Sequence, residues 1–191
     1  YQIPGERIQI ACTRANGQTY SNVEVVSGQY AWDEDIAGAE IVPGKGKATA
    51  RPNLLRERLI RLWASPQGAP KAAAAGKENT SVDWGTGKAV VSYPIPGVAG
   101  AIAKATLSAQ NQAEHIEVRD GNTVMTFDYA KYDDFNNPLN KIEAFMPGTM
   151  VEKRNGTTVR DLTTTETETG NLYVVMPVPA SVRKAATPQS N

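Results

Sequence analysis

Two acidic segments of this sequence place several side chains that could ligate a metal close together. They are Asp33–Asp35 (DED) and Asp133–Asn137 (DDFNN), and their oxygens are of the kind that Ca²⁺ takes. Neither segment has the ligand and glycine spacing of a calcium loop, and aspartate and asparagine are also the residues that turns favour. We therefore expect both segments to be solvated turns, and we predict no metal site.

The other candidates for chemistry are His115, the one histidine of the chain, and the segment Gly44–Lys47 (GKGK). A general base at His115 would need a nucleophile, and the Gly-x-Ser-x-Gly elbow that exposes a serine is absent. The GKGK segment lacks the Gly-x-x-x-x-Gly-Lys-Ser/Thr pattern of a phosphate-binding loop. We expect a structural histidine and a flexible loop, with no catalytic residue and no cofactor.

Composition excludes several classes of function. The 191 residues include 20 basic and 20 acidic side chains, so no charge excess favours nucleic acid as a partner. Cys12 is the one cysteine, which rules out an intrachain disulfide and a cysteine-based zinc site. Because Cys12 lies in the apolar run IQIACT, we expect it to be a small core residue.

No apolar stretch approaches the roughly 20 residues of a membrane-spanning helix, so we expect no membrane span. The first residue is Tyr1 rather than methionine, which would fit a removed signal peptide. Together with the low cysteine content, this favours a periplasmic or secreted bacterial protein.

Strands and two helices must position these residues. Period-two alternation predicts strands before residue 33, and a longer series of strands follows residue 87. Between them, residues 53–64 predict a helix after Pro52, and an Ala-rich second helix ends at Gly76 as its C-cap. An apolar stripe would cover the sheet and arginines would take the other side: Leu55, Leu59, Leu62 and Trp63 against Arg56, Arg58 and Arg61.

This order predicts an α+β fold, a curved antiparallel sheet or incomplete β-barrel with a helical lid. We expect one sheet of at least seven strands in one domain over residues 1–186, and a polar tail or start of a linker at 187–191. The helix over 53–64 would lie across the concave face. An incomplete barrel would leave an apolar trough, whose candidate lining is Val91, Ile116, Val118, Val124, Phe127 and Trp63.

The last apolar run, Leu172–Met176, is followed by Pro177 and Pro179, which cannot continue a sheet ladder. It therefore predicts a final strand. Ala180–Ala185 would form at most a short helical turn, and the segment after it has nothing apolar to bury.

Three segments carry a resemblance to a known family: VVSGQYAWD, RERLIRLWASPQGAPKAAAA and the ending NLYVVMPVPASVRKA. From about Val25 to Ala185 the chain resembles the region before the hydrolase domain of secreted bacterial metallo-β-lactamase-fold proteins. The resemblance implies that zinc chemistry belongs to a downstream domain with a His-x-His-x-Asp-His motif. This chain, with one histidine, would then be a non-catalytic accessory domain.

A second pattern, Tyr129, Tyr132, Asp133 and Phe135 followed by Phe145–Pro147, is similar to a strand pair of periplasmic lipoprotein-carrier folds. That likeness implies an incomplete barrel that holds acyl chains. Two hypotheses follow. The chain is an extracytoplasmic binding or accessory domain for an apolar small molecule or lipid, or it is a structural subunit that joins other proteins through its edge strands.

Overall fold

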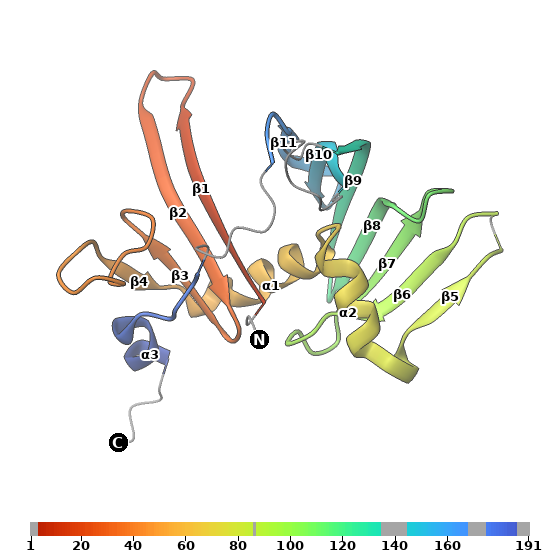
Figure 1. Cartoon of the computed structure of the whole chain (residues 1–191), viewed down its shortest axis with the longest axis horizontal. Coiled ribbons are helices and arrows are strands. Elements are labelled where there is room, and N and C mark those ends of the chain that lie inside the picture. The colour runs from red at the N-terminus through yellow and green to blue at the C-terminus, as the bar shows by residue number, and fades with distance from the viewer. Residues whose placement is uncertain (1–3, 86, 135–144, 168–174, 187–191) are drawn as a thin grey trace. The chain divides into compact units, whose positions relative to one another are not determined.

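The computed structural model describes residues 4–85, 87–134, 145–167 and 175–186, which form two compact units (Figure 1). The first unit comprises residues 1–62 with 173–191, and the second comprises residues 63–172. The fold is α+β with two antiparallel sheets, so the predicted class is confirmed. This division does not test the prediction of one domain over residues 1–186, which stays a prediction.

The first unit contains a four-stranded antiparallel sheet in the order β1-β2-β3-β4. Its strands are β1 (Gly5–Thr13), β2 (Thr19–Ser27), β3 (Tyr30–Glu34) and β4 (Ala48–Ala50). Val23 and Val25 of β2 alternate onto one face and pack there with Trp32. Val182 of the C-terminal helix α3 (Ala180–Ala186) completes this core, so distant parts of the chain share one interior.

Helix α1 (Leu55–Ala64) follows a 3-10 turn, Pro52–Leu54, as Pro52 predicted. Its residue Arg58 does not face solvent, which corrects the expectation for the arginine side of the helix. The Arg58 guanidinium is 3% exposed and donates to the backbone oxygens of Val25 and Trp32, at 3.1 and 2.7 Å. It also contacts an Asp33 oxygen at 2.5 Å, so a buried cation fastens this helix to β2 and β3.

The expectation of a solvated turn is wrong for Asp33 and Glu34, whereas Asp35 is exposed in a bend after β3. Asp33 lies in β3 between Arg58 and Arg51, and Glu34 is 3% exposed. Glu34 accepts hydrogen bonds from Trp32 Nε1 at 2.9 Å and from Arg7. These carboxylates are therefore parts of the interior, because β3 continues through them.

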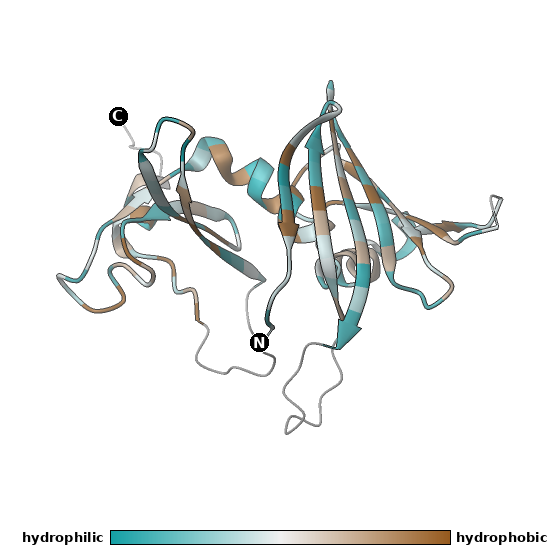
Figure 2. Ribbon diagram, turned by 90° about the horizontal axis from the view of Figure 1, so that it is seen from above, coloured by the Kyte–Doolittle hydropathy of each residue, from teal (hydrophilic) through white to brown (hydrophobic). Residues whose placement is uncertain are grey.

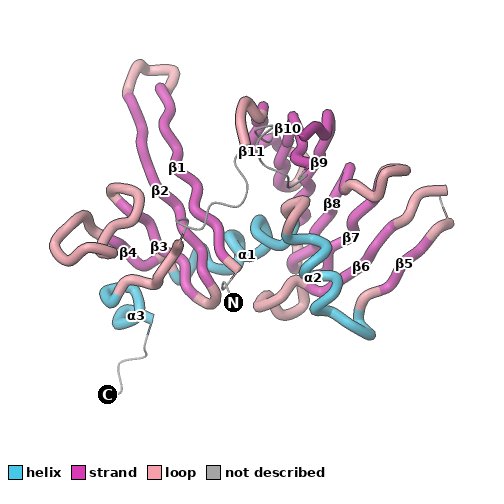
Figure 3. The backbone as a smooth tube through the Cα atoms, in the orientation of Figure 1, coloured by secondary structure: helices cyan, strands magenta, loops and turns pink. Residues whose placement is uncertain are grey.

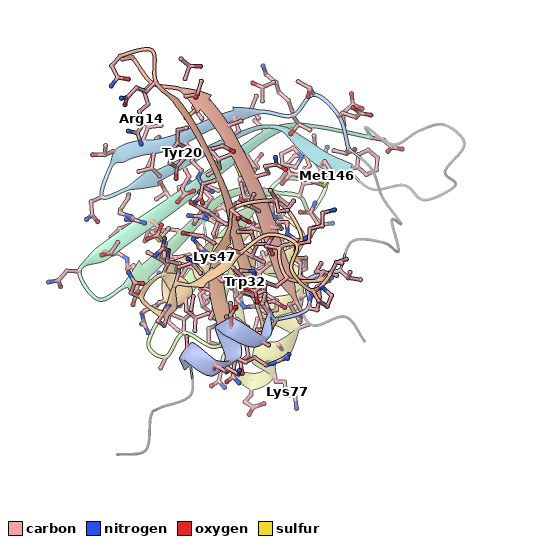
Figure 4. All side chains as sticks on the ribbon, turned by 90° about the vertical axis from the view of Figure 1, so that its left-hand side faces the viewer. Arg14, Tyr20, Trp32, Lys47, Lys77 and Met146 are labelled. Atoms are coloured by element: carbon pink, nitrogen blue, oxygen red, sulfur yellow. The ribbon has the colours of Figure 1, made fainter. Side chains whose placement is uncertain are left out.

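Cys12 is exposed, so the prediction that it is a core residue is wrong. It pairs with Tyr20 in the part of the β1–β2 hairpin that continues beyond the region where β3 pairs with β2. Near it the guanidinium of Arg14 lies 5.2 Å from the centre of the Tyr20 ring, and Figure 4 labels both residues. The apolar alternation of β1 thus continues along the strand beyond the part that the core covers.

The second unit contains a seven-stranded antiparallel sheet in the order β11-β10-β9-β8-β7-β6-β5. Side chains along its strands alternate in hydropathy, as Figure 2 shows. One face is buried through pairs such as Ile116 with Phe127 and Val118 with Met125. Its strands are β5 (Ser81–Asp83), β6 (Val90–Pro94), β7 (Ile102–Leu107), β8 (Ala113–Asp120), β9 (Thr123–Asp134), β10 (Phe145–Arg154) and β11 (Thr157–Thr163).

The expectation of one sheet under the helix 53–64 is wrong. The strands before that helix form a sheet of their own, to which Arg58 binds. Alternation identifies strands but does not say which strands pair. The same series of strands can therefore form one continuous sheet or two separate sheets. The helix that packs on the seven-stranded sheet is α2 (Gly68–Gly76), which contacts β6 and is followed by the 3-10 turn Lys77–Asn79.

The predicted final strand, 172–176, lies largely outside the described residues. Val175 and Met176 are described, and neither is in a strand. Met176 and Val178 pack against the core of the first unit, and α3 follows Pro179 over seven residues, which is longer than the expected single turn. The tail 187–191 lies outside the described residues.

We predict that Arg58→Met destabilises the protein by about 3 kcal/mol, because it leaves buried carbonyl groups and the Asp33 carboxylate with fewer partners. Urea unfolding followed by circular dichroism measures the effect. The control is Arg56→Met, an exposed position on the same helix, which should change stability by less than about 0.5 kcal/mol. Equal effects of the two substitutions would contradict the role of the buried cation.

Candidate functional site

Small residues bring α2 close to the sheet. The Ser65 hydroxyl accepts a hydrogen bond from the Gly68 amide at 3.0 Å, which caps the start of the helix. Ala69 and Ala72 of this helix are buried. Figure 3 shows α2 next to strands of the seven-stranded sheet. At the other end, a Cβ on Gly76 would lie 2.9 Å from Pro94 Cδ and 2.5 Å from Thr80 Oγ1. This close approach explains why the last residue of the helix is Gly76. The positive φ of 47° belongs to Lys77 and not to Gly76.

The facing strands also present small side chains. Val91 pairs with Ala105 across β6 and β7. The register of β7 and β8 shifts after Thr106, so that Leu107 pairs with Ala113. Because of this irregularity, Ala113 lies on the buried face of the sheet. Regular alternation would have placed the adjacent residue there instead.

A pocket of about 950 Å³ lies between α2 and these strands. The pocket is partly open to solvent, and small side chains of helix and sheet, such as Ala69, Ala73 and Ala105, form part of its wall. The volume is within the range of about 300–1,000 Å³ that is typical of small-molecule sites. The lining residues are Pro66, Gln67, Ala69, Pro70, Lys71, Ala73, Val91, Tyr93, Ala105, Leu107, Asn111, Gln112, Ala113, Tyr132, Phe145 and Met146.

Two tyrosines in the wall turn their hydroxyl groups to protein partners. The Tyr93 hydroxyl donates to the Trp63 carbonyl at 3.1 Å, and the Tyr132 hydroxyl donates to the Ala113 carbonyl at 2.7 Å. Burial raises the pKa of Tyr93, and burial together with the nearby Glu114 carboxylate raises the pKa of Tyr132 to about 12. Both phenols are neutral at physiological pH, and their hydroxyl groups are already engaged.

A tight turn between β7 and β8 supplies the polar rim of the pocket. The Ser108 hydroxyl accepts hydrogen bonds from the amides of Gln110 and Gln112, at 3.1 and 3.2 Å. Asn111, with φ of 61°, completes the turn. Asn111 and Gln112 are thereby held beside the pocket, and Gln67 and Lys71 of the α2 region lie along it as well.

Of the residues predicted to line a trough, Val91 lines this pocket. Ile116, Val118 and Phe127 are fully buried in the sheet's own core. Val124 is half-buried and alternates with Met125, so it lies on the opposite face of β9. Their role in binding stays a prediction.

Trp63, the remaining predicted lining residue, is half-buried and does not line the pocket. Its indole Nε1 is buried and has no hydrogen-bond partner among the described residues. The lining residues that sequence reasoning missed include four alanines, together with Leu107 and Phe145. The Ala-rich composition of 69–76 was the available signal.

His115 is part of a charged ladder on the other face of the sheet. Its Nδ1 lies 2.6 Å from Asp128 Oδ1, and Lys153 Nζ lies 3.4 Å from Asp128 Oδ2. Burial alone would raise the pKa of Asp128, but the hydrogen bonds and charges of His115 and Lys153 outweigh it, and the net pKa is lowered. The three side chains alternate with buried neighbours and do not line the pocket.

In the described part of the chain, no cluster of three His, Cys, Asp or Glu side chains could hold a metal ion. Asp133 and Asp134 of the second acidic segment are exposed at the end of β9, and residues 135–137 lie outside the described residues. None of the described helices is both long enough and apolar enough to cross a membrane.

No family model, no curated protein and no solved structure matches this chain.

We predict that Gly76→Ala destabilises the protein by about 1 kcal/mol, although alanine is the better helix former. The added Cβ would overlap Pro94 and Thr80, and such overpacking costs about 1–3 kcal/mol. Urea unfolding measures the change, with exposed Ala75→Ser as the control. A stabilised Gly76→Ala variant would show that α2 does not need this close approach.

We predict that Asp128→Asn destabilises the protein at neutral pH and that the difference disappears in acid. The lowered pKa of Asp128 means that its carboxylate stabilises the fold above the pKa of the unfolded chain, and that this stabilisation is lost as the pH falls through the folded value. Unfolding of both proteins between pH 7 and about pH 3 tests this. A difference that stays constant over this range would contradict it.

Proposed function

We propose that this chain is a non-catalytic extracytoplasmic binding or accessory domain that holds an apolar ligand between α2 and the seven-stranded sheet. The observation that carries the proposal is the pocket of about 950 Å³ with its walls of alanine, proline, leucine and aromatic rings. Apolar surface of this kind gains about 0.8 kcal/mol for each CH₂ group that it removes from water.

The arrangement of the second unit supports the finer fold proposal of an incomplete barrel with a helical lid. Strands β5 and β11 are the two edges of the sheet and are not paired with each other. Helix α2, rather than the helix 53–64, would be the lid, since α2 contacts β6 and lines the pocket. An open barrel leaves a route for a ligand that a closed one would block.

The resemblances to the accessory region of secreted metallo-β-lactamase-fold proteins and to lipoprotein carriers belong to this proposal. In it, the protein is periplasmic or secreted, its partner is an apolar small molecule or lipid, and any hydrolase activity resides in a separate C-terminal domain. Nucleic acid is not a partner. The proposal needs no catalytic residue. The hydroxyl groups of Tyr93 and Tyr132 are neutral and already donate to backbone carbonyls.

A second proposal, an assembly subunit, draws support from the sheet edges. Val82 of β5 is 54% exposed, and Val159 and Leu162 of β11 are 48% and 46% exposed. Exposed apolar edge strands are sites for strand addition by another protein. Under this proposal, the protein forms oligomers that Val159→Lys weakens, and analytical ultracentrifugation measures the change.

We predict that Ala73→Phe weakens binding of the neutral apolar probe N-phenyl-1-naphthylamine about tenfold. The new ring would occupy part of the pocket, and loss of burial equivalent to two CH₂ groups corresponds to about tenfold in affinity. Probe fluorescence measures the dissociation constant.

The matched control is Ala74→Phe, the same change one residue along α2, at an exposed position that does not line the pocket. It should leave the affinity unchanged. Circular dichroism and melting temperature verify that both variants are folded. If the wild-type protein does not bind the probe, or if both variants bind it equally, the binding proposal fails.

A further inference from the structure

Among the described residues that line the pocket, Lys71 is the one that carries a charge. It lies on α2 one residue after Pro70, and its side chain is exposed. Within the described part of the chain it forms no ion pair, whereas Glu114, a carboxylate that acts on Tyr132 of the pocket wall, is paired with Lys88. The pocket thus combines an apolar interior with one positive charge.

The remaining polar groups of the wall do not offset this charge. The hydroxyl groups of Tyr93 and Tyr132 donate to backbone carbonyls, and the Gln67 side chain lies against the Met146 sulfur. Asn111 and Gln112 are neutral amides on the rim. No carboxylate is among the described residues that line the pocket, and the Glu114 carboxylate that acts on Tyr132 is paired with Lys88.

We infer that the ligand is an amphiphile with one long apolar chain and an anionic carboxylate head that lies at Lys71. This inference rests on the proposed binding function and deepens it. The chain lies against Val91, Ala105 and Leu107, and the head remains at the exposed edge of α2, where its charge keeps most of its hydration. The volume is about six times the roughly 150 Å³ that holds benzene in a dry cavity, so an extended chain fits better than a small ring.

Three ligands with the same twelve-carbon chain test the inference: dodecanoate, dodecanol and dodecyltrimethylammonium. Each displaces N-phenyl-1-naphthylamine at pH 8, below its micelle concentration, in low salt. We expect dodecanoate to bind about fivefold more tightly than dodecanol, the ratio that corresponds to an exposed ion pair, and the cation to bind most weakly. The preference should shrink in 0.5 M NaCl, because salt screens exposed charges.

Lys71→Gln should abolish the preference for dodecanoate, measured as the ratio of the dodecanoate and dodecanol dissociation constants of the same variant. The matched control is Lys77→Gln, which removes the same charge from an exposed position just after α2 and outside the pocket lining. It should keep the preference. Figure 4 labels Lys77.

The outcomes separate this inference from the proposed function. If dodecanoate and dodecanol bind equally, or if the preference survives in Lys71→Gln, the carboxylate inference is overturned and the apolar pocket stands. If the probe itself does not bind, the binding function is overturned, and the inference with it. If the probe binds and none of the three ligands displaces it, the inference alone is overturned.

Discussion

The close approach of a helix with very small side chains to a sheet is the constraint on which the candidate site depends. Gly76 lets the end of α2 touch Pro94, and the Ser65 cap holds its start. Between these two fixed points the helix offers alanines to strands that also present alanines. Ala69 and Ala72 are buried, and the pocket lies where small side chains of helix and strands leave room beside them.

The two units use polar groups differently. In the first unit, Arg58, Asp33 and Glu34 lie in the interior and satisfy one another and the strand carbonyls. In the second, the tyrosine hydroxyl groups near the pocket are bound to backbone oxygens. Buried polar atoms are costly unless they are paired, and both solutions meet that requirement. In the second, the pocket wall is mostly apolar, and its polar groups other than the tyrosines are Gln67, Lys71, Asn111 and Gln112.

Local signals in the sequence predicted the elements well and their assembly poorly. Pro52 and the Leu/Trp spacing located α1, and alternation located most strands of the meander. The same signals could not divide the strands between two sheets, since pairing is set by long-range contacts such as those of Val182 with the core of β2 and β3. Cys12 and Arg58 were placed wrongly for the same reason: the burial of a side chain depends on which layer covers it.

The pocket was harder to predict than the fold, and the reason is physical. A search for a binding trough selects large apolar side chains, such as Ile116 and Phe127, but large side chains fill space and become core. A cavity forms where side chains are small and the backbone is held apart, so its signature is alanine and glycine beside residues that fix the backbone. Val91 was identified because it lies at the boundary between core and cavity. Its side chain is on the sheet's buried face but is only half-buried, and it meets Ala105 rather than another large residue.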